Sequence, residues 1–305
     1  MGASAIGIGF VLQPELEYLD LLAPVFGALV DYFEIAPETT WWATEGGALL
    51  ANGFSSEFYE IGQRWAPAGA RSKPFVAHGV GLSLGSADPG DRARQLRWLR
   101  RLEEDQGRFE FRWLSDHLAV TTAAGEALAL PLPLLPTAAA AALVRGRLRE
   151  LQARVVPDVA FENAAHYFYY GDPLAEAGLI AQILALPRSH VVLDLYNVWM
   201  MGQNMGFDPR EFLRRLDLSR VIEIHVAGGS YSDFGWLPEG RRLRLDSHDE
   251  AVPEPVWALL AEVLPRCVNL RGVTLERMEG TVQGADVGPI AGELRRLRRA
   301  VEALG

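Results

Sequence analysis

The chain repeats one pattern, in which a short apolar run is followed by a segment with helical periodicity. The apolar runs lie at residues 5–12, 31–36, 74–80, 111–120, 158–163, 190–198, 220–228 and 271–277. Helical spacing of leucine, alanine and valine follows seven of them, at 15–30, 91–105, 137–152, 173–186, 209–217, 253–264 and 288–304. Eight β-type runs alternating with helices in 305 residues predict an α/β protein with a single (β/α)8 TIM barrel over residues 1–305.

An open, doubly wound sheet is the alternative architecture. Such a sheet usually has fewer strands or a phosphate-binding glycine turn, and Gly-Ile-Gly-Phe at 7–10 lacks the G-x-G-x-x-G spacing. The net charge of −10 argues against nucleic acid as a partner. The single cysteine, Cys267, excludes a cysteine metal cluster. Because neither a secretory signal nor a membrane-spanning stretch is recognisable, we expect a cytoplasmic protein without a membrane partner.

Acidic residues and histidines stand at the carboxyl ends of the predicted strands, where barrels carry their chemistry. These ends hold Glu34, His78, Asp116, His117, Glu162, Asn163, Asp194, Asn197, Glu223, His225 and Glu276, and the loop after the seventh strand adds Asp246 and His248. Glu223 and His225 are two positions apart, so their side chains point to the same side of the strand. The mouth of the barrel is therefore predicted to gather many carboxylates and imidazoles.

Any one of these residues alone is more often structural than functional. A lone strand-end histidine is commonly a hydrogen-bonded core residue, and a carboxylate before a helix is commonly its cap. The whole set is different, because converging carboxylates repel unless a cation neutralises them, and Arg277 is the one clear basic residue at these ends. The donors exceed the roughly four to six that one ion needs. We therefore predict two or more ions at the mouth, and iron, manganese or zinc would suit these ligands.

Seven motifs, in order along the chain, resemble those of one known family. They are AHGVGLSLGS (77–86), LSDHLAV (114–120), FENAAHY (161–167), LDLYNVWMMGQNMGFD (193–208), IHVAGG (224–229), LDSHDEAVPEPVW (245–257) and TLER (274–277). Together they resemble the multinuclear non-haem iron-dependent oxidative enzymes, the family of the methanobactin-biosynthesis oxidase. The resemblance implies two or three irons in mixed Fe(II)/Fe(III) states, and dioxygen as co-substrate. It also implies a ribosomally made precursor peptide, oxidised at the β-carbon of an iron-bound side chain, and in many members a separate peptide-recognition partner protein.

The resemblance also implies roles for individual residues. The implied iron ligands are His78, Asp116, Glu162, Asn163, Asp194, Glu223, His225, Asp246, His248 and Glu276. His225, Asp246, His117 and Asn197 would act in catalysis. The chain departs from the family at four positions: Ala36 and Gly229 replace frequent histidines, Thr39 a frequent asparagine, and Asp116 the usual glutamate. We therefore expect a dinuclear core with a weak or absent third site, and the family's cysteine chemistry is in question.

Two other functions stay open. The first is a divalent-metal barrel resembling sugar isomerases or phosphodiester-cleaving enzymes, which uses the same ligand types. A lysine placed for a sugar hydride shift would favour it, but the only lysine, Lys73, precedes the third strand. The second is a metal-binding scaffold without activity, which Ala36 and Gly229 favour. The aromatic stretches at 166–172 and 230–236 follow strands five and seven, where they could hold a peptide.

Overall fold

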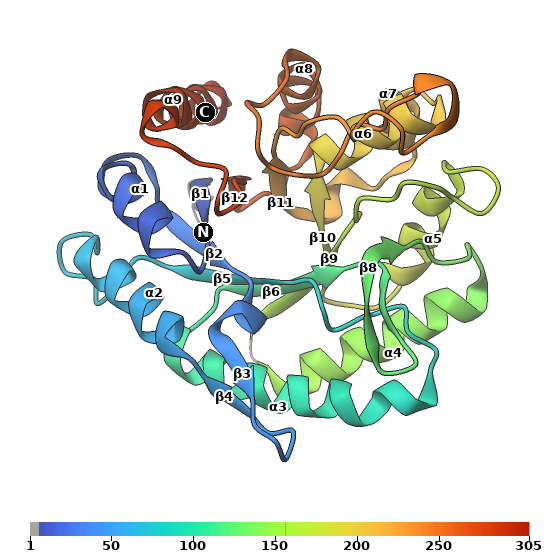
Figure 1. Ribbon diagram of the computed structural model, residues 1–305, viewed down its shortest axis with the longest axis horizontal. Coiled ribbons are helices and arrows are strands. Elements are labelled where there is room, and N and C mark those ends of the chain that lie inside the picture. The colour runs from blue at the N-terminus through green and yellow to red at the C-terminus, as the bar shows by residue number, and fades with distance from the viewer. Residues whose placement is uncertain (1–5, 156, 305) are drawn as a thin grey trace.

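A computed structural model describes residues 6–155 and 157–304 and shows a closed barrel of eight parallel strands. The strands are β1 (Gly7–Leu12), β2 (Tyr32–Ile35), β5 (Phe75–Gly79), β6 (Trp113–His117), β9 (Asp158–Glu162), β10 (Ser189–Asp194), β11 (Val221–Val226) and β12 (Gly272–Leu275). They follow one another around the ring in chain order, and β1 closes it by pairing with both β2 and β12. Figure 1 shows the helices surrounding this ring. The predicted TIM barrel is confirmed; residue 5, at the start of the first predicted run, lies outside the described residues.

The surrounding helices agree with the predicted segments in most places. They are α1 (Leu16–Leu29), α2 (Gly53–Arg64), α3 (Arg92–Phe109), α4 (Ala138–Arg154), α5 (Ala175–Ile183), α6 (Leu195–Met205), α7 (Pro209–Arg215), α8 (Glu254–Val263) and α9 (Val287–Glu302). Short 3-10 turns occur at Pro37–Thr40, Pro89–Asp91, Leu218–Arg220, Pro238–Gly240, Leu264–Arg266 and Gly284–Asp286. Within the described ranges, none of the helices has both the length and the apolar character needed to cross a membrane.

A small apolar floor fills the inside of the barrel, separate from the larger core between strands and helices. It consists of Tyr32, Val76, Trp113, Ala160, Val192 and Ile222, all buried. Side chains alternate between the two faces of a strand, so in β2, β5 and β9 the residue two positions after the floor residue also points inward, one layer nearer the mouth. Thus Tyr32 precedes Glu34, Val76 precedes His78, and Ala160 precedes Glu162. The floor therefore supports the layer of polar residues above it.

The ring of Tyr32 lies flat against β1 and β12, at positions that only glycine can occupy. A Cβ added to Gly9 would lie 2.4 Å from Tyr32 Cζ, and one added to Gly272 would lie 2.2 Å from the Tyr32 hydroxyl. Real Cβ atoms do not approach other atoms this closely. The two glycines therefore make the space in which an aromatic ring can enter the barrel.

Two sequence predictions of strands need correction. Residues 195–198 were included in the sixth run but form the first turn of α6, because the Asp194 carboxylate accepts the Asn197 N–H at 2.6 Å and caps the helix. The run at 111–120 ends as a barrel strand at His117, and a new strand, β7 (Val120–Ala123), begins a hairpin with β8 (Glu126–Leu132).

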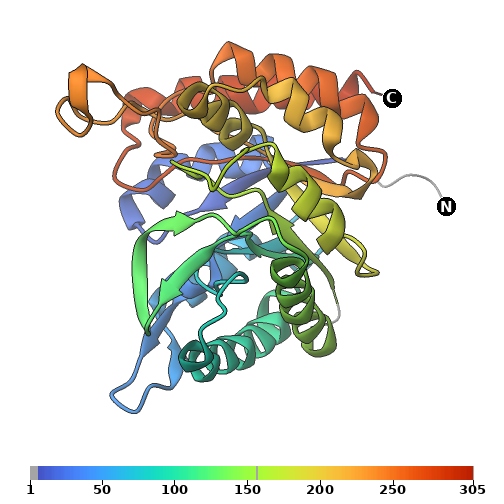
Figure 2. The same ribbon diagram turned by 90° about the vertical axis from the view of Figure 1, so that its right-hand side faces the viewer.

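Two further elements were not predicted from the sequence. They are a second hairpin, formed by β3 (Trp41–Ala43) and β4 (Leu49–Ala51), and helix α2. Both hairpins lie outside the barrel. The strands β3, β4 and β8 are largely apolar in sequence yet mostly exposed, so the alternation of a half-buried strand does not mark them. Figure 2 shows the two hairpins and the loop between β11 and α8 projecting on the same side of the molecule.

Candidate metal centre

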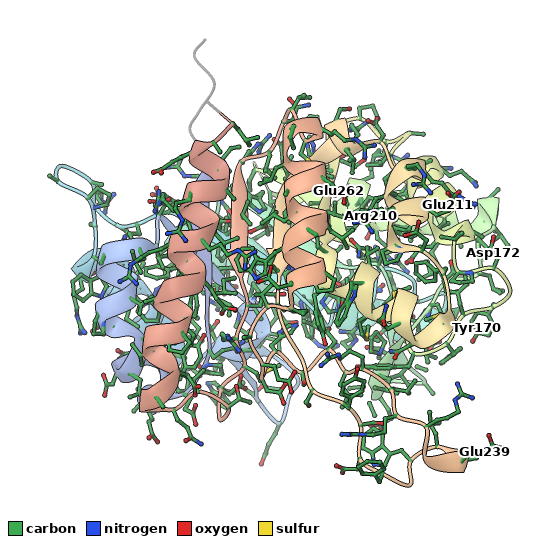
Figure 3. The ribbon with its side chains drawn as sticks, turned by 90° about the horizontal axis from the view of Figure 1, so that it is seen from above. Tyr170, Asp172, Arg210, Glu211, Glu239 and Glu262 are labelled. Atoms are coloured by element: carbon green, nitrogen blue, oxygen red, sulfur yellow. The ribbon has the colours of Figure 1, made fainter. Side chains whose placement is uncertain are left out.

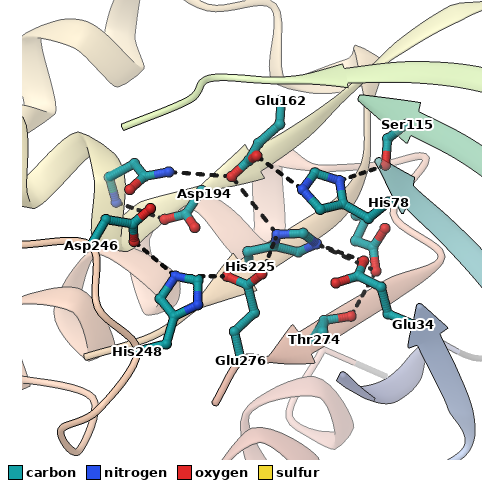
Figure 4. Close-up of polar contacts among 12 residues, drawn as sticks. Glu34, His78, Ser115, Glu162, Asp194, His225, Asp246, His248, Thr274 and Glu276 are labelled. Atoms are coloured by element: carbon teal, nitrogen blue, oxygen red, sulfur yellow. Dashed lines mark hydrogen bonds and ion pairs between the residues drawn. The ribbon is translucent and has the colours of Figure 1, made fainter. Parts of the chain in front are cut away.

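Side chains from seven strands and one loop meet at the mouth of the barrel. They are Glu34, His78, His117, Glu162, Asp194, His225 and Glu276 from the strands or the residue just after β12, and Asp246 and His248 from the loop after β11 (Figure 4). Donor atoms lie within 4.8 Å of one another in three groups: Glu34–His78–His225, His78–His117–Glu162 and Glu162–Asp194–His225. This is the constellation that the strand ends predicted.

Glu162 stands between two of these groups. Its Oε2 lies 3.1 Å from His78 Nε2 and 2.9 Å from His117 Nε2. Its Oε1 lies 3.9 Å from His225 Nδ1 and accepts a hydrogen bond from the Asn197 side-chain amide at 3.2 Å. One carboxylate therefore faces two neighbouring positions for an ion, and Asn197 holds its orientation.

Several buried polar atoms at the centre have no hydrogen-bond partner among the described residues. They are His225 Nδ1, Asp194 Oδ2, Glu276 Oε2 and Glu34 Oε1. A buried polar atom without a partner costs roughly 1–3 kcal/mol, more when it is charged. A divalent cation bound among Glu162, Asp194 and His225 would satisfy His225 Nδ1 and Asp194 Oδ2, and imidazole with carboxylate is a donor set that iron accepts. The residues therefore fit a metal ion.

The loop between β11 and α8 brings Asp246 and His248 to the same mouth. His248 Nε2 lies 2.8 Å from Asp246 Oδ1 and 3.7 Å from Glu276 Oε2. His248 has a φ of 51°, the left-handed conformation that non-glycine residues seldom adopt. Such conformations persist where the surrounding structure fixes them, commonly at functional sites.

Two glycines just after β11, Gly228 and Gly229, let this loop pack directly on the barrel. A Cβ on Gly228 would lie 2.1 Å from the Ala251 carbonyl oxygen, and one on Gly229 would lie 2.1 Å from the Leu245 carbonyl oxygen. The frequent family histidine at position 229 therefore has no space in this chain. Asp249 holds the loop as well, because its Oδ1 accepts the Ser230 N–H at 2.9 Å.

The charges at the site are strongly coupled. Burial lowers the pKa of His78, but Glu162 and Glu34 reverse this and raise it to about 9. Burial likewise lowers the pKa of His248, and Asp246 with Glu276 raises it to about 10. Burial raises the pKa of Asp194 well above its usual range, and the carboxylates around it add to the rise. Without a cation, the protons on these histidines balance the carboxylates; a metal ion would take over that role.

Six of the ten residues that the resemblance implied as ligands are not members of the three groups. Asp246, His248 and Glu276 lie beside the groups, whereas Glu223, Asp116 and Asn163 are held by other contacts. Asp116 is adjacent to His117 on β6, so its side chain points to the opposite face, where Oδ2 accepts the Leu82 N–H at 3.2 Å. Asn163 is fully used by the backbone of Asp194, donating to its carbonyl oxygen at 2.9 Å and accepting its N–H at 3.0 Å. Arg277 also turns away from the site and pairs with Glu293 at 2.9 Å.

Two members of the groups were absent from the implied ligands: His117, which the resemblance assigned to catalysis, and Glu34. Glu34 ends β2, is 1% exposed, and lies with Oε2 3.0 Å from His225 Nε2. Its position at a strand end was the only signal in the sequence. A cavity of about 300 Å³ opens beside these residues and is also lined by Val11, Gln13, Ala36, Thr39, Val80, Met278 and Glu279.

The family model of the RiPP precursor modification enzyme MbnB/TglH/ChrH matches residues 6–300. The chain belongs to this family. The match confirms the family that the seven motifs predicted, and the family consists of enzymes that modify precursors of ribosomally made peptides.

Relatives of similar sequence are known as UPF0276 proteins, a designation that states no activity. The chain is 33% identical over 234 residues to a UPF0276 protein of Anaeromyxobacter, covering 76% of each chain. It is 28% identical over 271 residues to one of Pseudomonas aeruginosa, covering 89% of this chain and 85% of the other. A UPF0276 protein of Caulobacter vibrioides is 35% identical over 187 residues, which are 61% of this chain and 62% of that protein, less than two thirds of its length.

Solved structures of similar shape include metal-binding and sugar-converting barrels. One is the IOLI protein with a bound zinc atom, with a TM-score of 0.59, 12% identity and coverage of 98% and 99% of the two chains. Another is D-psicose 3-epimerase of Clostridium cellulolyticum, with a TM-score of 0.54, 14% identity and coverage of 98% and 96%. At these identities the likeness shows the barrel fold alone.

Proposed function

We propose that this chain is a non-haem iron enzyme that uses dioxygen to oxidise a side chain of a ribosomally made precursor peptide at its β-carbon. His78, His117 and Glu162 would hold one iron, and Glu162, Asp194, His225 and Glu276 a second. Asp246 and His248 would complete the centre or hold a weaker third ion. When bound, iron supplies the electron-accepting couple and open coordination positions for the substrate and dioxygen.

The observation that carries this proposal is the set of unpartnered buried donors at the mouth. His225 Nδ1, Asp194 Oδ2 and Glu276 Oε2 lie without hydrogen-bond partners in the part of the chain that the structure describes. Apolar residues would stabilise a merely structural barrel better than such atoms do. Their presence together with two further histidines favours a metal that does chemistry over an inactive scaffold.

The chain's own residues would admit the substrate and hold the metal ligands in place. The cavity beside the centre admits a peptide side chain, and its walls are partly apolar, with Val11, Val80 and Met278. Glu34 and Glu162 hold the histidines, and Asn197 orients Glu162. A separate peptide-recognition protein remains part of the proposal, since many members of the resembling family use one.

The position of Lys73 argues against the sugar-isomerase alternative. Lys73 lies before β5, at the opposite end of the barrel from the mouth, and its ammonium group donates to the Val30 carbonyl oxygen. Because the sequence has no other lysine, none can assist a hydride shift at the centre.

The test is the metal content and its oxidation state. The protein is purified without oxygen after growth with iron, metals per chain are counted, and a Mössbauer spectrum is taken. Two or more irons, partly ferrous and partly ferric, support the proposal. Stoichiometric zinc or manganese despite added iron would contradict the proposal and favour hydrolysis or isomerisation as the reaction. A protein without any metal would favour the scaffold function.

A second step tests the oxidation itself. Dioxygen consumption is followed with precursor-like peptides encoded beside the gene, in the wild type and in Glu162→Gln. This substitution keeps the size of the side chain but removes the shared negative charge. Asp105→Asn is the matched control, because Asp105 is also fully buried but lies on α3, where it accepts the Trp41 indole N–H at 2.6 Å. We expect consumption in the wild type and control and none in Glu162→Gln.

A further inference from the structure

We infer that His225 binds its ion through Nδ1, and that Glu34 is a positioning residue that accepts a hydrogen bond from the Nε2–H, with Glu223 as a fixed negative charge below. The inference rests on the metal centre proposed above. It assigns to Glu34 a role that the resemblance did not imply, and it removes Glu223 from the ligands that the resemblance did imply.

The two nitrogens of the His225 ring face different surroundings. Nε2 lies 3.0 Å from Glu34 Oε2, a normal hydrogen-bond length. Nδ1 lies 3.4 Å from Glu276 Oε1 and 3.9 Å from Glu162 Oε1, and it has no hydrogen-bond partner among the described residues. Figure 4 shows Glu34 on one side of the ring and Glu162 and Glu276 on the other.

Only one of these sides suits a metal. A neutral imidazole carries one N–H and one lone pair, and a metal takes the nitrogen with the lone pair. The N–H must then be the nitrogen with a close acceptor, which is Nε2 beside Glu34. Histidines that bind metals commonly donate their other N–H to a carboxylate, which fixes the ring and makes the ligating nitrogen more basic. Nδ1 is left to the group formed with Glu162 and Asp194.

Glu223 is held by the floor of the barrel. Its Oε1 accepts from the Tyr32 hydroxyl at 2.8 Å and the Thr274 hydroxyl at 2.6 Å, and its Oε2 accepts from the Trp113 indole N–H at 2.5 Å. The side chain is 0% exposed. Three neutral donors on both oxygens satisfy an ionised carboxylate, so Glu223 keeps its charge and offers little to a metal.

This charge lies directly beneath the histidine. Glu223 Oε1 is 3.8 Å from His225 Nε2, on the same side of the ring as Glu34. The Tyr32 and Trp113 rings meet edge to face at 5.4 Å, so the groups that fix Glu223 are themselves packed. Two buried carboxylates therefore face the N–H side of one imidazole, which favours the more oxidised state of an ion on its other side.

A competing arrangement is an ion among Glu34, His78 and His225, whose donor atoms also lie within 4.8 Å. In that arrangement His225 would bind through Nε2, and Glu34 would be a ligand. The two arrangements differ in how many ions remain when Glu34 is neutralised.

The experiment titrates metal-free protein with Fe(II) under nitrogen and measures stoichiometry and dissociation constants. The variants are Glu34→Gln, Glu34→Asp and the buried control Asp105→Asn. We expect Glu34→Gln to bind as many ions at saturation as the wild type, with the affinity of one ion weakened about 10–100-fold. The reduction potential of that ion should shift upward, which a purely structural residue would not cause. Asp105→Asn should match the wild type in all three measurements.

Other results would overturn the inference. Loss of one ion at saturation in Glu34→Gln would make Glu34 a ligand, and unchanged affinity and potential would make it merely structural. A wild type that binds no Fe(II) would overturn the proposed function as well, whereas the first two results leave that function standing. If Glu34→Gln does not fold, Glu34→Asp must show the weakened ion, because it keeps the charge but withdraws it by one methylene.

Discussion

Glu162 is the residue on which the two ion positions depend most. It contacts His78 and His117 through one oxygen and faces His225 through the other. We expect Glu162→Ala to weaken both ions by more than about 100-fold, beyond the effect of losing an indirect partner. His117→Ala should weaken one ion only. Elemental analysis checks both, with His190→Ala, a histidine at the opposite end of the barrel, as control. Equal loss in Glu162→Ala and His117→Ala would contradict the shared role.

Metal binding should also depend on pH through His78. Its pKa is raised to about 9 in the metal-free fold, mainly by Glu162 against the effect of burial, whereas an unfolded histidine titrates near about 6.5. The protonated ring therefore stabilises the metal-free fold fully below about pH 6.5, and this contribution disappears as the pH rises through about 9.

A metal requires the neutral ring, so binding at pH 7.5 should release at least one proton. Affinity should then rise about tenfold per pH unit for each proton released, up to about pH 9. Titration calorimetry in two buffers of different ionisation enthalpy measures the released protons. Identical heats in the two buffers would show that the rings are already neutral.

At the scale of the elements, strand β1 shows that the close packing of the barrel floor limits which residues the strand can hold. Gly9→Ala would place a methyl group 2.4 Å from both the Tyr32 ring and the Thr274 hydroxyl. We expect the free energy of unfolding to fall by about 1–3 kcal/mol, the usual effect of overpacking. Gly107→Ala is the control: its Cβ meets nothing within 4 Å, it lies in α3, and it should stabilise the protein by up to about 1 kcal/mol. Urea unfolding measures both free energies. A Gly9→Ala variant as stable as the wild type would show that the floor rearranges to admit the methyl group.

The same elements show what the sequence could predict. Barrel strands were visible because they are buried on both faces and read as apolar runs ending in polar residues. The hairpin strand β8 is also apolar in sequence, but most of its residues are exposed, so an apolar run alone does not tell a barrel strand from a hairpin. At the site, alternation alone could have separated Asp116 from His117, because neighbours on a strand face opposite ways. That Asn163 bonds to the Asp194 backbone, and that Glu34 meets His225 from 191 positions away, depends on packing that no local pattern contains.

At the scale of the molecule, exposed aromatic side chains project near the mouth. Phe234 is 77% and Trp236 63% exposed in the loop after β11, and Tyr170 lies in the loop before α5 (Figure 3). Exposed apolar patches commonly mark binding surfaces. We expect Phe234→Ala with Trp236→Ala to raise KM for the peptide at least several-fold, with metal content unchanged and stability within about 0.5 kcal/mol.

A suitable control for this pair is Arg210→Ala. Arg210 of α7 and Glu262 of α8 form an exposed ion pair at 2.6 Å that belongs to two outer helices and not to these loops (Figure 3). Steady-state kinetics with the peptide compares the variants. An unchanged KM in the aromatic double variant would assign these side chains to packing of the loop.

One strand contributes no polar side chain to the centre. β1 presents Gly7, Gly9 and Val11 inward, and Val11 and Gln13 line the cavity where every other strand offers a polar group near its end. The ions would therefore have no protein ligand on the β1 side of the cavity, which leaves that side for the substrate. A peptide entering there would meet them with a single face of its β-carbon. We expect one of the two hydrogens on a β-CH₂ group to be removed selectively, so that peptides deuterated at one or the other position would give products of different mass.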